Sequence, residues 1–121
     1  MSMSVLAVDD SRTMRDMLRL TLADAGIEPH LAEDGQHGLE VLDGLEPDAI
    51  ITDINMPRMD GFEFIDAVRA KSEYNQIPIL VLTTESGDQL KMRARKSGAT
   101  GWIVKPFDPK KLVSALHRVV G

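Results

Sequence analysis

The chain has 121 residues, which is enough to bury a hydrophobic core in one domain but too few for two independent domains. Its composition, 43% hydrophobic and 27% charged, is typical of a soluble globular protein, and no apolar run approaches the roughly 18 residues that a membrane span needs. The net charge of −5 disfavours nucleic acid as a direct partner, and the absence of cysteine excludes disulfides, thiolate metal sites and cysteine nucleophiles. Because the start, MSMSVLAVDD, has no basic segment before its apolar residues, it does not resemble a signal peptide, and we expect a cytoplasmic protein without membrane contacts.

The first apolar run, Val5–Val8, is typical of a buried strand, and a helical pattern follows it. Ser11 is a suitable N-cap for this helix, and Gly26 is a suitable residue to end it. The predicted buried face of the helix consists of Met14, Met17, Leu18, Thr21, Leu22 and Ala25. The second run, Ile27–Ala32, contains Pro29, which has no backbone N–H to donate, so we expect this strand at an edge of the sheet.

Three further apolar runs continue the alternation of strand and helix: Ala49–Thr52, Ile79–Leu82 and Trp102–Val104. The remaining helices are predicted to begin near Gly35, Gly61, Gly87 and Asp108. Parallel strands need crossover connections, and strands that are apolar along their whole length are buried on both faces. The pattern therefore predicts an α/β domain with a five-stranded parallel sheet between two layers of helices.

Polar residues follow the ends of these strands. Asp9 and Asp10 follow the first, Asp53 the third, Thr83 and Thr84 the fourth, and Lys105 the fifth. In an open doubly wound sheet, ligands bind beyond the carboxyl ends of the strands, where the strand order reverses. If the order is 2-1-3-4-5, the three aspartates meet at that point.

Three carboxylates in one place repel each other, so they stay ionised only around a cation, and oxygen ligands alone favour Mg²⁺ or Mn²⁺. Lys105 and the hydroxyl of Thr83 would complete a pocket that receives an anion. Each residue also has a simpler interpretation: a single strand-end aspartate is usually a helix N-cap, threonine is common in strands, and Lys-Pro often marks a turn. Only the conjunction of all these residues at one edge favours a site.

Four motifs, VDDSRTM, ITDINMPRMDG, VLTTES and WIVKPF, resemble in order and spacing the receiver domain of two-component response regulators, of the stand-alone CheY type. The resemblance covers essentially the whole chain. It implies a flavodoxin-like (βα)5 fold, doubly wound, with sheet order 2-1-3-4-5. It also implies a single receiver domain over residues 1–121, with no effector domain.

The resemblance further implies that a CheA-like histidine kinase transfers a phosphoryl group to Asp53, which acts as the nucleophile. Asp10 and Asp53 would ligate Mg²⁺ together with the backbone carbonyl of Asn55, and Asp9 would hold a metal-bound water. Mn²⁺ is the alternative ion.

Lys105 and Thr83 are implied as the other catalytic residues, with a cis Lys105–Pro106 bond directing the lysine into the pocket. Thr83 and Trp102 are implied as the switch, in which the threonine moves to the phosphoryl group and the aromatic ring turns inward. Three further positions match residues that modulate the lifetime of the phosphoryl group: Asn55, Thr84 and Glu85.

The implied output surface comprises the fourth helix, fifth strand and fifth helix, and the implied target is a flagellar motor switch. The fourth helix is basic through Lys91, Arg93, Arg95 and Lys96, which is either a solvated face or a site for an acidic partner. Arg12 either approaches the phosphoryl group or offsets the aspartates.

Other functions share parts of this pocket. A phosphate sink and a phosphorelay shuttle would use the same residues. A haloacid-dehalogenase-like phosphatase also has a strand-end aspartate and Mg²⁺, but the Asp-x-Asp motif that it needs after the first strand is missing, as is room for a cap. We therefore expect a monomeric signalling protein that promotes its own phosphorylation and dephosphorylation and is not a turnover enzyme.

Overall fold

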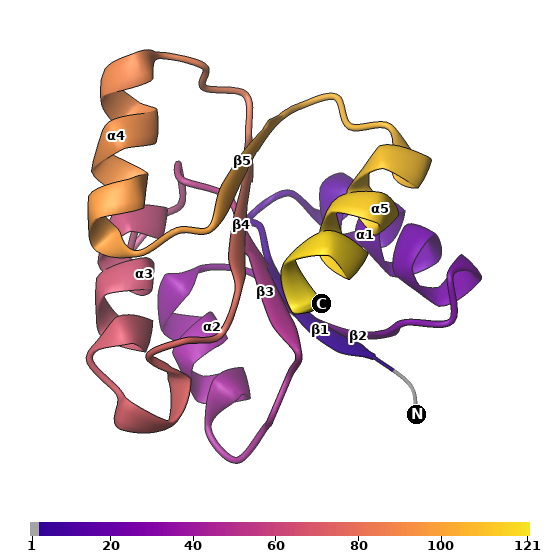
Figure 1. Ribbon diagram of the computed structural model, residues 1–121, viewed down its shortest axis with the longest axis horizontal. Coiled ribbons are helices and arrows are strands. Elements are labelled where there is room, and N and C mark those ends of the chain that lie inside the picture. The colour runs from indigo at the N-terminus through magenta and orange to yellow at the C-terminus, as the bar shows by residue number, and fades with distance from the viewer. Residues whose placement is uncertain (1–2) are drawn as a thin grey trace.

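Strands and helices alternate along the whole described chain, residues 3–121, in a computed structural model (Figure 1). The strands are β1 (Ser4–Val8), β2 (Glu28–Ala32), β3 (Ala49–Thr52), β4 (Ile79–Thr83) and β5 (Gly101–Val104). The helices are α1 (Arg12–Asp24), α2 (Gly35–Leu42), α3 (Gly61–Arg69), α4 (Asp88–Ser97) and α5 (Pro109–Val120), with a 3₁₀ turn, η1, at Ser72–Tyr74. The strand predictions are confirmed to within one residue at each end.

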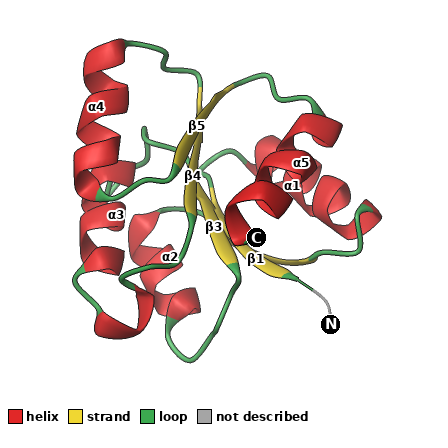
Figure 2. Cartoon of the chain, in the orientation of Figure 1, coloured by secondary structure: helices red, strands yellow, loops and turns green. Residues whose placement is uncertain are grey.

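All five strands are parallel and lie in the order β2-β1-β3-β4-β5. Helices α2, α3 and α4 cover one face of the sheet, and α1 and α5 cover the other (Figures 1 and 2). This is the flavodoxin-like fold that was predicted. Pro29 lies in β2, which is an edge strand as expected, because the sheet continues only on its β1 side.

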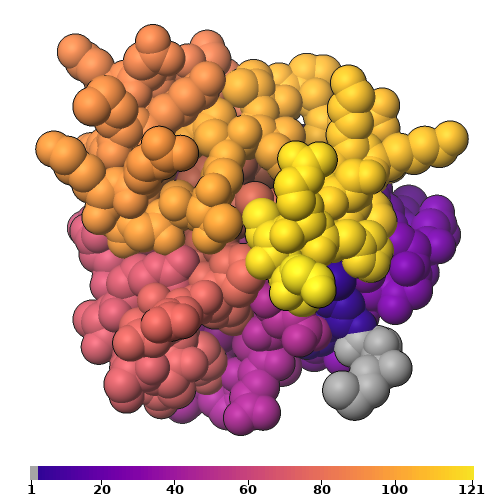
Figure 3. Space-filling view, in the orientation of Figure 1, coloured from indigo at the N-terminus to yellow at the C-terminus, as the bar shows by residue number. Residues whose placement is uncertain are grey.

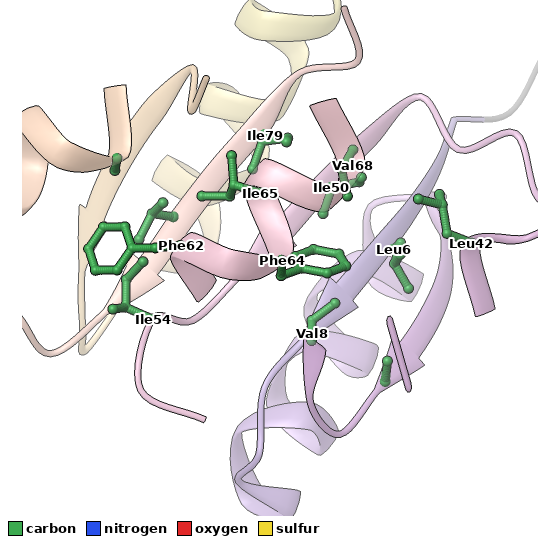
Figure 4. Close-up of a cluster of buried hydrophobic side chains, with 13 residues drawn as sticks. Leu6, Val8, Leu42, Ile50, Ile54, Phe62, Phe64, Ile65, Val68 and Ile79 are labelled. Atoms are coloured by element: carbon green, nitrogen blue, oxygen red, sulfur yellow. The ribbon is translucent and has the colours of Figure 1, made fainter. Parts of the chain in front are cut away.

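Each face of the sheet has its own hydrophobic core. Figure 4 shows the cluster under α2, α3 and α4, where the ring of Phe64 lies fully buried between Val8 and Leu6 on one side and Ile50 on the other. The second cluster, under α1 and α5, includes Leu18, Leu22, Leu112 and Leu116. Together the two clusters hold the carboxyl ends of β1, β3 and β4 at one edge of the sheet.

The helix ends follow the predicted signals. The Ser11 hydroxyl accepts from Met14 N–H at 3.2 Å, and Gly26 adopts the left-handed φ of 75° after the helix. The predicted buried face of α1 is too wide, because Met17 is 43% exposed and Ala25 is exposed. Of the predicted face, only Leu18 and Leu22, four residues apart, are buried, while Met14 and Thr21 are half-buried.

Among residues 3–121, no helix combines the length and the apolar composition that crossing a membrane requires.

Candidate functional site

The three predicted aspartates meet at the carboxyl edge of the sheet. Backbone hydrogen bonds extend the ladder past the strands, from Asp9 N–H to Ala32 O and from Asp53 N–H to Val8 O, each 3.0 Å long. Carboxylate oxygens of Asp9, Asp10 and Asp53 all lie within 4.8 Å of one another. Asp9 and Asp53 are buried and Asp10 is exposed, so the cluster opens to solvent on the Asp10 side.

Lys105 lies between two of these carboxylates. Its Nζ donates to Asp9 Oδ2 at 2.7 Å and to Asp53 Oδ2 at 2.9 Å, and its side chain is only 10% exposed. The residue follows β5 directly, its N–H donates to Thr83 O at 2.8 Å, and the bond to Pro106 is cis. The lysine therefore reaches the acidic cluster from the end of β5, which lies two strands from β3 and three strands from β1.

Burial and the neighbouring charges have opposite effects on the pKa of Asp9 and on the pKa of Lys105. Burial raises the pKa of Asp9 above its ordinary value of 3.8, although the bonds from Lys105 and Ser11 N–H oppose that shift. Burial would lower the pKa of Lys105, but its hydrogen bonds to Asp9 and Asp53 outweigh burial and raise the pKa above 10.5. The ammonium group thus stays charged, and the buried carboxylates depend on a cation.

The main chain around Asp53 is held tightly. Ile54 N–H donates to Asp53 Oδ1 at 2.6 Å, and a capping box between Asp60 and Glu63 begins α3. At Gly61, a Cβ atom would lie 2.2 Å from Asp53 O, so any larger residue would displace the backbone where the helix starts against the end of β3. The sequence shows a glycine at a helix start but not this close approach.

Glu85 connects three of the predicted switch and modulating residues. Its N–H donates to Thr83 Oγ1 at 3.4 Å, its carbonyl accepts from Trp102 Nε1 at 3.0 Å, and its carboxylate accepts from Asn55 Nδ2 at 3.0 Å. Thr83 is fully buried and Trp102 half-buried, whereas Thr84 is exposed. The loop after β4 thus joins the aromatic residue on β5 to the edge that carries Asp53.

A second ion pair, between Arg58 and Asp34, lies at the same edge of the sheet and is not predicted from the sequence. Arg58 adopts a φ of 66° and donates to Asp34 Oδ2 through Nη2 at 2.7 Å and Nε at 2.8 Å. Asp34 caps α2 by accepting from His37 N–H at 2.8 Å. Burial would raise the pKa of Asp34, but the His37 and Arg58 bonds lower it below 3.8. The loops after β2 and β3 are therefore joined.

Comparison with known proteins points to one family. The response regulator receiver domain profile matches residues 5–117. Chemotaxis protein CheY1 of Helicobacter pylori is 41% identical over 98% of each chain, and sensor histidine kinase CheAY of the same organism is 37% identical over 96% of this chain and 15% of its own. A solved structure of Vibrio cholerae chemotaxis protein CheY4 superimposes with a TM-score of 0.95 at 49% identity, covering 98% of this chain and 99% of that one.

Proposed function

Because this chain belongs to the response regulator receiver domain family, as a homologue of the CheY chemotaxis proteins, we propose that Asp53 accepts a phosphoryl group. The observation that carries this proposal is the place of the Asp53 carboxylate, at the end of a central strand, beside Asp9 and Asp10 and 2.9 Å from Lys105 Nζ. We also infer that residues 1–121 act as one receiver domain, which is supported by the single sheet that all five strands share.

The acidic cluster fits Mg²⁺, because its donors are carboxylate oxygens close together, without sulfur or imidazole. We infer that Asp10 and Asp53 hold the ion with the backbone carbonyl of Asn55, and that Asp9 holds it through a water molecule. Mn²⁺ would suit the same donors. When bound, the ion supplies positive charge that offsets the charge of the transferring phosphoryl group.

The protein's own residues position the reactants. An Asp53 oxygen forms the new P–O bond while the P–N bond of a phosphohistidine breaks, and the released imidazole takes up a proton. Lys105 exchanges its carboxylate contacts for phosphoryl oxygens, and its raised pKa keeps it charged for that role. Thr83 donates its hydroxyl to the phosphoryl group once the weak bond from Glu85 N–H breaks.

We infer that the donor is a histidine kinase. The proposal is supported by the similarity to part of a protein named as a sensor histidine kinase and by the homology to chemotaxis proteins. In this scheme the chain is a signalling protein that forms and loses its own aspartyl phosphate, without turning over a separate substrate.

The proposed output surface comprises α4, β5 and α5, which form the orange to yellow part of Figure 3. Residues 88–121 contain eight lysines and arginines but only two acidic residues, Asp88 and Asp108, in a chain of net charge −5. A groove between α4 and β5 is lined in part by Met92 and Trp102. An acidic partner segment with an apolar anchor suits this surface, and a flagellar motor switch is the target that the chemotaxis homologues suggest.

Intact-mass spectrometry after incubation with acetyl phosphate and Mg²⁺ tests the proposal. We expect one added phosphoryl group in the parent protein, none in Asp53→Asn, and none in Asp10→Asn, which would lose a metal ligand. The exposed Asp66→Asn on α3 is the matched control and should react like the parent. Equal labelling of Asp53→Asn would overturn the assignment, and steady hydrolysis of p-nitrophenyl phosphate would favour the phosphatase.

A further inference from the structure

The start of α1 carries an unusual pair of charges. Its first residues include Arg12 and Arg15, and its first turn contains no acidic residue. The N-terminal end of a helix has a partial positive charge, so cations there disfavour the helix. These arginines are therefore not explained by helix stability.

Arg15 makes a specific contact with the acidic cluster. Its Nη1 reaches back along the helix and donates to the backbone carbonyl of Asp9 at 2.8 Å. Arg15 is half-buried, whereas Arg12 is exposed and, within residues 3–121, makes no side-chain hydrogen bond. The two residues thus carry the same charge at the same helix end, but only Arg15 is fixed in place.

This contact completes a set of four hydrogen bonds around one residue. Asp9 N–H donates to Ala32 O at 3.0 Å, Asp9 Oδ1 accepts from Ser11 N–H at 2.9 Å, and Asp9 Oδ2 accepts from Lys105 Nζ at 2.7 Å. The carbonyl that Arg15 holds belongs to the peptide group between Asp9 and Asp10, which is planar. With Asp9 N–H fixed to β2 and Asp9 O fixed to Arg15, both backbone torsions of Asp9 are restrained, and so is the position from which Asp10 projects.

Asp10 itself lacks such support. Its carboxylate accepts no hydrogen bond within the described part of the chain, and the residue is exposed. Its direction is therefore set by the backbone before it. We propose that Arg15 is a positioning residue that holds the peptide between Asp9 and Asp10, so that the two carboxylates are arranged for Mg²⁺ before it binds. This inference rests on the metal site in the proposed function.

The direction of the change in Mg²⁺ affinity distinguishes a positioning role of Arg15 from an effect of its charge. Arg15 is a cation close to a cation site, so its charge alone weakens Mg²⁺ binding, and removing it would tighten binding. If Arg15 instead acts by positioning, removing its donor weakens binding. Groups that orient metal ligands typically contribute about 10–100-fold to affinity, and we expect about tenfold here, because Arg15 acts through the backbone.

The experiment is calorimetric titration of Mg²⁺ into the parent, Arg15→Met, Arg15→Lys and Arg12→Met. Methionine keeps most of the buried stem and removes the donor, lysine keeps the charge and one donor, and Arg12→Met removes an equal charge nearby. Amide hydrogen exchange of Ser11 without Mg²⁺ is the second readout, since its N–H reports the geometry of the turn.

We expect about tenfold weaker Mg²⁺ binding in Arg15→Met, partial recovery in Arg15→Lys, and unchanged or tighter binding in Arg12→Met. Exchange at Ser11 should accelerate in Arg15→Met, while the core amides of β3 keep the parent rates. Unchanged or tighter binding in Arg15→Met, with the core amides protected, would overturn the positioning role but leave the proposed function standing. A parent protein that binds no Mg²⁺ would overturn both.

Discussion

Lys105→Met should make the protein depend on Mg²⁺ for much of its stability. The lysine is the only cation that contacts the Asp9 and Asp53 carboxylates within residues 3–121, and the three side chains are 10%, 2% and 9% exposed. Removing one partner of a buried ion pair costs about 3–5 kcal/mol, because the remaining charge is left without compensation. We therefore expect the free energy of unfolding without Mg²⁺ at neutral pH to fall by about 3 kcal/mol, the lower end of that range, because the site opens to solvent beside Asp10.

Protonation of Asp9 should limit the loss of stability in Lys105→Met and make that loss depend on pH. Burial already raises the pKa of Asp9, and losing Lys105 removes a cause that lowers it. An acid whose pKa is higher in the folded than in the unfolded state stabilises the fold fully below the unfolded pKa, near 3.8, and this stabilisation is lost as pH rises through the folded pKa. The free energy of unfolding of Lys105→Met should therefore be close to that of the parent in acid and furthest below it at neutral pH.

Urea unfolding with and without Mg²⁺, at acidic and neutral pH, measures these effects. Mg²⁺ should stabilise Lys105→Met more than the parent, because the ion no longer competes with an ammonium group for the same oxygens. Lys110→Met, at an exposed position on α5, is the control and should match the parent. The reasoning fails if Lys105→Met without Mg²⁺ stays within about 0.5 kcal/mol of the parent at neutral pH, the size of an ordinary surface effect.

Three further changes test other parts of the site. Beryllofluoride with Mg²⁺ should shift the emission of Trp102, the only tryptophan, to the blue as the ring turns inward, whereas Mg²⁺ alone should not. A shift that survives in Thr83→Ala would show that the threonine hydroxyl does not couple the modified Asp53 to the Trp102 ring. Gly61→Ala should lower the free energy of unfolding by about 2–4 kcal/mol and slow labelling of Asp53, because its Cβ would lie 2.2 Å from Asp53 O, while Gly87→Ala, with open space around the Cβ, should change neither. Arg58→Met should flatten the acid side of the stability profile measured by urea unfolding. The lowered pKa of Asp34, to which Arg58 contributes, gives the fold stability above 3.8 that is lost as pH falls through the folded pKa. An unchanged profile would contradict the role of the Arg58–Asp34 pair.

Much of the site is predictable because its residues lie at strand ends. Asp9, Asp10, Asp53, Thr83 and Lys105 each follow an apolar run, and parallel strands bring their carboxyl ends to one edge. The strand order itself came from the family resemblance, because periodicity alone does not say which strands are neighbours. Given that order, the meeting of the three aspartates follows from topology.

The site residues that were not predicted from the sequence act through contacts that a pattern of apolar and polar residues does not reveal. Arg15 and Gly61 touch backbone carbonyls, and a pattern of side-chain types does not reveal which carbonyl an arginine reaches. Arg58 pairs with Asp34 across 24 residues, and it does so from a left-handed conformation that a non-glycine residue rarely adopts. The exposed Met17 was placed in the core because a methionine at helical spacing suits either environment.

The most direct test of the account identifies the atom that carries the phosphoryl group. Borohydride reduces an aspartyl phosphate to homoserine, so the protein is treated with acetyl phosphate and Mg²⁺, reduced, digested and sequenced by mass spectrometry. We predict homoserine at position 53 and aspartate at positions 9 and 10, with no conversion when Mg²⁺ is omitted. Homoserine at position 9 or 10, or phosphate on a hydroxyl such as that of Thr83 with position 53 unchanged, would contradict the central claim.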